Sequence, residues 1–180
     1  MESSDFCARG STSCAFKEFN KNGDINLGSF NDKTLPPFEL KIHKSDLTSD
    51  RQFKIAAESQ TSTGYIWLCV DILSEDDHIP VSRDRYAYYN DMLTRDYLMN
   101  VSRNGMAAHG ISISKFTLKS DGTTALNGVS GVGHKDTVMA TITINKGISE
   151  GLYFVVIAYG SPFRPSPMVC IKEIVVNVLP

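Results

Sequence analysis

The sequence has no long apolar run and no cluster of basic residues. No stretch approaches the roughly 18 apolar residues of a membrane-spanning helix, and Met1–Asp5 has neither the basic nor the apolar region of a signal peptide. A start this polar also fits the cut edge of a longer precursor. The 18 Lys and Arg are scattered among 20 Asp and Glu, for a formal net charge of −2. We therefore expect neither a membrane nor a nucleic-acid partner.

Cysteine is scarce, with four residues in 180 and no CxxC pair. A disulfide scaffold and a zinc site are therefore not expected. Cys7 and Cys14 are either two free thiols or the ends of a small disulfide loop. Cys69 and Cys170 lie in apolar, strand-like runs and are expected to pack as small buried hydrophobic side chains.

Catalytic and metal-binding motifs are missing as well. The four histidines, at positions 43, 78, 109 and 134, are dispersed, and none stands at zinc-site spacing from another ligand. Gly128–Gly131 lacks the full pattern of a nucleophile elbow, and the run to Gly133 lacks the ending of a phosphate loop. Asn20–Asn31 has Ile25 where a calcium loop needs glycine. We expect no cofactor, no metal and no catalytic residue, and interpret the chain as a binding protein rather than an enzyme.

What the sequence does contain is a series of short strand signals. Phe38–Lys44 alternates apolar and polar residues, as a half-buried strand does. Further runs predict strands over 53–57, 65–73, 111–119, 137–145, 152–159 and 168–178. Strands of this length, bounded by turn residues, predict an all-β fold, an immunoglobulin-like antiparallel β-sandwich of about seven strands.

The remaining residues define the expected domain organisation. Residues 1–34 are polar and read as an irregular N-terminal arm, and 35–180 as one sandwich domain. This domain carries a long insertion over 74–110, in which we expect one short helix within 82–99, where Tyr97-Leu98-Met99 has helix-compatible spacing. Residues 120–135 form a long polar loop with two turn dipeptides, Asp121-Gly122 and Asn127-Gly128.

Three connections between strands stand out. The first is Gln60-Thr61-Ser62-Thr63-Gly64, which leads into Tyr65 and the only tryptophan, Trp67. The second is Gly131-Val132-Gly133-His134, and the third is Ser161-Pro162-Phe163 after a strand that ends at Tyr159. In an immunoglobulin-like sandwich, the second-to-third, fourth-to-fifth and sixth-to-seventh strand connections gather at one end.

Together these loops resemble the chagasin family of inhibitors of papain-like cysteine proteases. That family's first loop reads Asn-Pro-Thr-Thr-Gly-Tyr/Phe-any-Trp and is matched here at Thr63, Gly64, Tyr65 and Trp67, with Ser62 conservative. Its second loop, Gly-any-Gly-Gly, is met by Gly131-Val132-Gly133, with His134 in place of the last glycine. Its third, Arg-Pro-Trp, resembles Ser161-Pro162-Phe163, so the arginine is lost and the tryptophan is replaced by phenylalanine. The resemblance covers 38–180 apart from the insertions, and this layout is most similar to the falstatin type of malaria parasites.

The resemblance implies a reversible competitive inhibitor that wedges the 60–64 loop into the active-site cleft. Its partner would be a papain-like, falcipain- or cathepsin-like cysteine protease in a 1:1 complex, and the free chain a monomer in a secreted or vacuolar compartment. A narrow tip suits a cleft, while Gly64 permits a tight turn and the aromatic residues anchor the outgoing strand. The implied protease-binding residues are Gln60, Thr61, Ser62, Thr63, Gly64, Tyr65, Gly131, Val132, Gly133, His134, Ser161, Pro162 and Phe163.

Other interpretations of the same residues remain open. Trp67 is more readily explained as a core anchor than as a protease contact. The alternative function is an immunoglobulin-like adhesion or recognition module for a non-protease partner, with a surface supplied by Tyr86, Tyr88, Tyr89 and Tyr97 of the insertion. The sandwich also predicts that the strand ending at Tyr159 separates Cys69 from Cys170 by about twice 4.8 Å, beyond disulfide reach.

Overall fold

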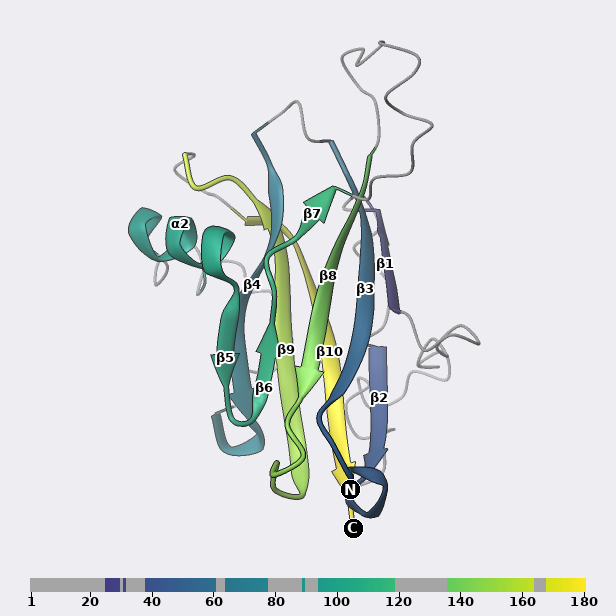
Figure 1. Cartoon of the computed structure of the whole chain (residues 1–180). Helices are drawn as coiled ribbons and strands as arrows, with labels where there is room; N and C mark the ends of the chain where they lie inside the picture. Colours follow the sequence, from purple (N-terminus) through teal and green to yellow (C-terminus); the bar gives the residue numbers. More distant parts are fainter. Residues whose placement is uncertain are drawn as a thin grey trace, which may run out of the picture.

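Ten strands in two sheets form a sandwich in the computed structural model (Figure 1), which describes residues 25–29, 31, 38–60, 64–77, 89, 94–118, 136–163 and 168–180. One sheet has the order β1-β3-β8-β6-β5, with β7 also paired to β8, and the other has the order β2-β10-β9-β4. The strands are β1 Ile25–Ser29, β2 Phe38–His43, β3 Arg51–Ser59, β4 Ile66–Ser74, β5 Met106–Ala108, β6 Ile111–Ile113, β7 Thr117–Leu118, β8 Asp136–Ile144, β9 Gly151–Gly160 and β10 Met168–Leu179. The expected all-β, immunoglobulin-like sandwich is confirmed.

Alternate residues of the strands fill the space between the sheets. Every second residue of β3, from Phe53 to Ala57, and of β8, from Val138 to Ile144, belongs to the main core. They meet residues of β10 with the same period, Ile174, Val176 and Val178. The alternation of apolar and polar residues in these strands therefore reflects the burial of one face of each sheet.

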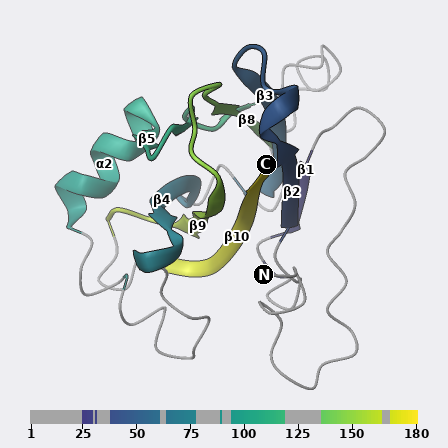
Figure 2. The same ribbon diagram turned by 90° about the horizontal axis from the view of Figure 1, so that it is seen from below.

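The β2-β10-β9-β4 sheet has a second buried face, covered by the helix α2, Arg95–Asn104. Leu98 and Val101 of α2 pack with Tyr89 against the outward-facing residues of β4 and β9, which are Leu68, Val70, Val156 and Ala158. Figure 2, seen along the strands, shows α2 outside β4. β9 is buried along almost its whole length, which explains why its sequence is continuously apolar rather than alternating.

Local signals fix the ends of α2. The side chain of Thr94 accepts a hydrogen bond of 3.1 Å from the backbone N–H of Tyr97 and caps the helix. Gly105 ends it with φ = 72°, and a Cβ there would lie 2.1 Å from the carbonyl oxygen of Ile113. The expected helix in the insertion is confirmed, and it continues beyond Met99 to Asn104.

The expected strand over 111–119 is interrupted. It consists of β6 and the two-residue β7, because Ser114 leaves the ladder and exchanges hydrogen bonds of 2.9 Å with the backbone of Thr141. β6 also pairs with β5 through a two-residue turn, His109 and Gly110, which both have positive φ. Primed turns of this kind match the twist of a hairpin.

The prediction of an irregular arm over 1–34 is wrong for Ile25–Ser29, which form β1. Ile25 and Leu27 are buried in the main core, and β1 pairs in parallel with β3. β2 also pairs in parallel, with β10, so the two edge pairs differ from the otherwise antiparallel sheets. The buried Lys172 of β10 holds β1, because its Nζ donates to the carbonyl oxygens of Leu27 and, at 2.9 Å, Ser29.

The strand order separates two cysteines as expected. Cys69 lies on β4 and Cys170 on β10, with β9 between them. Both are buried free thiols, so their packing role and their lack of a mutual disulfide are confirmed. Cys7 and Cys14 lie outside the described residues. In the part of the chain that the structure describes, no helix is long and apolar enough to cross a membrane.

Candidate functional site

The three candidate loops leave the sandwich at one end, which we call the loop end. Ser59 at the end of β3 pairs with Asp136 at the start of β8. In the other sheet, Gly160 at the end of β9 pairs with Ile66 and with Met168. The strand ends that flank the connections β3–β4, β7–β8 and β9–β10 therefore lie together, at the top of Figure 1. The strand ends are thus placed as the prediction of gathered loops requires.

Three aromatic residues beneath the first loop form a cluster that we call the aromatic base, namely Tyr65, Trp67 and Tyr159. The ring of Tyr159 stacks on Tyr65 at a centroid distance of 5.8 Å and lies 5.2 Å from Trp67. Trp67 is 2% exposed and belongs to the main core. The interpretation of Trp67 as a core anchor is confirmed.

Two hydrogen bonds tie the aromatic base to β3 across the sandwich. The backbone N–H of Gln60 donates to the hydroxyl of Tyr159 at 3.2 Å. The indole Nε1–H of Trp67 donates to the carbonyl oxygen of Glu58 at 2.8 Å. Both strands that flank the first loop are thereby fixed to the same cluster, which limits the positions that the loop can adopt.

Gly64 supplies the turn between the loop and β4. Its φ is 77°, a conformation that glycine adopts without a steric penalty. A Cβ at this position would meet no heavy atom within 4 Å. Glycine is therefore needed here for its backbone conformation and not to make room for a neighbour.

The structure describes six of the implied protease-binding residues, Gln60, Gly64, Tyr65, Ser161, Pro162 and Phe163. The other seven, Thr61, Ser62, Thr63, Gly131, Val132, Gly133 and His134, lie outside the described residues. In the third loop, Ser161 and Pro162 are buried, whereas Phe163 is 62% exposed. The Oγ of Ser161 accepts a hydrogen bond of 3.4 Å from the N–H of Phe163. Ser161 thus supports the turn, and Phe163 presents the accessible side chain.

Two cations lie against aromatic rings of the loop end, and the sequence interpretation missed both. The guanidinium of Arg95, at the start of α2, lies 4.9 Å from the ring centroid of Phe163. The Nζ of Lys172 lies 5.6 Å from the ring of Trp67. Neither pair is close in sequence, so only the folded chain reveals them.

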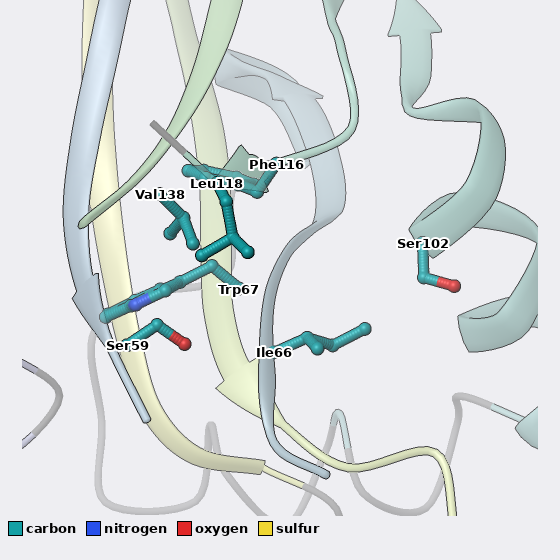
Figure 3. A pocket seen from close by; sticks show the side chains of 7 residues that line it. All are labelled: Ser59, Ile66, Trp67, Ser102, Phe116, Leu118 and Val138. Atoms are coloured by element: carbon teal, nitrogen blue, oxygen red, sulfur yellow. The ribbon is translucent and has the colours of Figure 1, made fainter. Parts of the chain in front are cut away.

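A small pocket of about 200 Å³ opens beside the aromatic base (Figure 3). It lies between α2, β4 and β8, and its lining is mostly apolar, formed by Ser59, Ile66, Trp67, Ser102, Phe116, Leu118 and Val138. This volume is below the range of about 300–1,000 Å³ typical of small-molecule sites. We therefore assign it no ligand.

The buried Cys69 does not suit nucleophilic chemistry. Burial raises the pKa of its thiol well above the ordinary value. A reactive cysteine needs the opposite, a lowered pKa and exposure. Among the described residues, no group of three or more His, Cys, Asp or Glu is placed to hold a metal ion.

Comparison with solved structures connects this geometry to a known architecture. A chain in the structure of PbICP-C in complex with falcipain-2 matches with a TM-score of 0.56 and 17% identity, over 86% of this chain and 98% of that chain. The chain shares the fold of PbICP-C.

Two weaker matches accompany PbICP-C. The solution structure of amebosin matches at a TM-score of 0.42 and 13% identity, over 86% of this chain and 97% of that chain. An inclusion body protein from Burkholderia cenocepacia matches at a TM-score of 0.28 and 6% identity, over 82% of each chain. No protein-family model and no curated protein sequence matches the chain.

Proposed function

We propose that this chain is a chagasin-type inhibitor of papain-like cysteine proteases. The observation that carries the proposal is that the strand ends flanking the three candidate loops lie together at one end of a sandwich with the fold of PbICP-C. PbICP-C was solved in complex with falcipain-2. The inhibition is reversible and competitive, and one chain binds one protease.

The loop at 60–64 acts as the central wedge. Thr63 and Ser62 are narrow enough to enter a cleft that admits an extended peptide. The strands on either side of them are fixed by the hydrogen bonds Gln60–Tyr159 and Trp67–Glu58. A loop held in place before binding loses less conformational freedom when the complex forms, and the affinity rises accordingly.

The other two loops contact the sides of the cleft. In the third loop, the exposed ring of Phe163 supplies the contact, while Ser161 and Pro162 are buried and hold the turn. Exposed aromatic residues are frequent anchors of protein interfaces. In the second loop, Gly131-Val132-Gly133-His134 lines the opposite side.

The tyrosines of the insertion give little support to the alternative function, an adhesion module. Tyr89 is 1% exposed, and its hydroxyl donates to Asp71 Oδ2 at 3.5 Å. The hydroxyl of Tyr97 donates to the carbonyl oxygen of Val70 at 3.0 Å. Both hydroxyls therefore fix the insertion to β4, and the buried ring of Tyr89 is not available to a partner.

The test is a titration of the full chain against papain and falcipain-2 with a fluorogenic peptide substrate. Thr63→Arg places a long cation at the tip of the wedge and is expected to raise Ki by at least about 100-fold, since a central clash removes most of the interface. Thr48→Arg is the matched control, because Thr48 is exposed and precedes β3 at the opposite end of the sandwich.

Competitive inhibition by the parent and by Thr48→Arg, lost in Thr63→Arg at an unchanged melting temperature, supports the proposal. Equal inhibition by both variants contradicts the central wedge. If the folded parent inhibits neither protease, the proposed function is wrong. Light scattering on the mixture measures the stoichiometry of the complex.

A further inference from the structure

The cation–π contact between Arg95 and Phe163 connects the insertion to the loop end. Arg95 begins α2, and Phe163 follows β9 by three residues. The guanidinium lies 4.9 Å from the ring centroid, and both side chains are exposed. In Figures 1 and 2, the chain beyond β9 extends toward α2. Phe163 therefore presents a ring with a positive charge directly against it.

Helix stability does not explain an arginine at this position. The N-terminus of a helix carries a partial positive charge, so a cation in the first turn is unfavourable. Among the residues that the structure describes, no carboxylate forms an ion pair with Arg95. Within that part of the chain, its five N–H donors are therefore not committed to a carboxylate.

The support beneath Arg95 is well fixed. Leu98 and Val101 bury the inner face of α2 against β4 and β9. Tyr97 donates its hydrogen bond to Val70, and Thr94 caps the first turn. Arg95 is therefore presented from a helix that is anchored on β4, which follows the first loop, and on β9, which precedes the third.

We propose that Arg95 adds a fourth contact to the inhibitory edge, in which it binds a carboxylate on the rim of the protease cleft beside the third-loop contact made by Phe163. This inference rests on the proposed function. Gly160, from which the third loop starts, is paired with Ile66, two residues after Gly64. The Arg95–Phe163 pair is thus continuous with the wedge. A planar guanidinium suits a carboxylate because it can donate two parallel hydrogen bonds.

The experiment measures Ki and the association rate for papain and falcipain-2 with the full chain and four variants, Arg95→Gln, Arg103→Gln, Phe163→Ala and the Arg95→Gln/Phe163→Ala double variant. Arg103 is the matched control, because it is exposed on the same helix at its other end. Arg95→Gln is expected to raise Ki about tenfold for at least one protease at low salt, and this effect shrinks in about 0.5 M salt as the charges are screened. The double variant loses less than the sum of the single variants, because the two side chains act together.

Several outcomes decide between the proposals. Unchanged Ki for Arg95→Gln, or an equal loss for Arg103→Gln, overturns the fourth contact while the parent still inhibits. If the losses of binding free energy in Arg95→Gln and Phe163→Ala add up to the loss in the double variant, the two side chains do not act together, and that part of the proposal is wrong. A parent chain that inhibits neither protease overturns the proposed function itself. Melting temperatures equal to that of the parent show that each variant is folded.

Discussion

The indole N–H of Trp67 donates to the carbonyl oxygen of Glu58 at 2.8 Å, and so joins the two sheets at the base of the first loop. Glu58 is the second-last residue of β3, and Trp67 is the second residue of β4. The loop therefore starts and ends on strands of different sheets that are bonded to each other. This bond fixes the separation of the two strand ends between which the loop runs.

Replacing Trp67 by phenylalanine should lower the free energy of unfolding by about 2 kcal/mol, since it removes a buried hydrogen bond and leaves unfilled volume. Tyr159→Phe removes only the hydroxyl that accepts from Gln60 and should cost about 1 kcal/mol. Urea denaturation measures both. A Trp67→Phe variant as stable as the parent would show that the indole N–H contributes little.

The two glycines with similar positive φ should respond differently to alanine. Gly64→Ala has open space and should cost only the backbone term, about 1 kcal/mol. Gly105→Ala has the same penalty and also a Cβ 2.1 Å from the carbonyl oxygen of Ile113, so the cost should exceed about 3 kcal/mol. Equal stabilities of the two variants, measured by chemical denaturation, would contradict the close approach of α2 and β6.

Lys172→Met should loosen β1. The substitution removes the donor that binds the carbonyl oxygens of Leu27 and Ser29, with an expected loss of about 1–3 kcal/mol. Amide hydrogen exchange of residues 25–29 should become faster than in the parent. Lys54→Met, at an exposed position of β3, is the control and should leave these amides protected. Unchanged protection in Lys172→Met would refute the role of Lys172.

Alkaline pH should weaken the attachment of α2. Burial and the nearby Asp71 raise the pKa of Tyr97 from 10.0 to about 12. In the unfolded chain Tyr97 loses its proton near pH 10, whereas in the folded chain it keeps it until about pH 12. The unfolded state thus binds fewer protons than the folded state in this window. The contribution of Tyr97 to the free energy of unfolding is therefore full below pH 10 and declines up to pH 12. The difference in unfolding free energy between the parent and Tyr97→Phe, followed across this range, should diminish with pH; a constant difference would contradict the shift.

The half-buried strands were predictable because burial of one face leaves a period of two in the sequence. β2, β3 and β8 follow this pattern. β9 was predicted from its continuous apolar run. Part of its outer face, Val156 and Ala158, is covered by α2, and this cover is not readable from the strand itself. The short helix around Tyr97 was predicted from its spacing, and its cap Thr94 and its end at Gly105 appear only in the folded chain.

Elements stabilised by distant partners were missed. β1 has only five residues in a polar context, and it is recognisable only by its pairing with β3 and by Lys172, which lies far along the chain. At the candidate site, the aromatic base combines the predicted Tyr65 and Trp67 with Tyr159 from another strand. The contact of Arg95 with Phe163 depends on tertiary packing alone, so no local sequence pattern predicts it.

β10 runs from the loop end to the opposite end of the sandwich (Figure 1). There the carbonyl oxygen of Pro180 lies 3.4 Å from Nδ1 of His43. A tether attached at Pro180 therefore points away from the three loops. Chains displayed in this way on a bead or a multivalent carrier would all face the solution with the same edge. Two chains joined through such tethers would act on a dimeric target with an effective concentration set by linker length, without any change to the loops themselves.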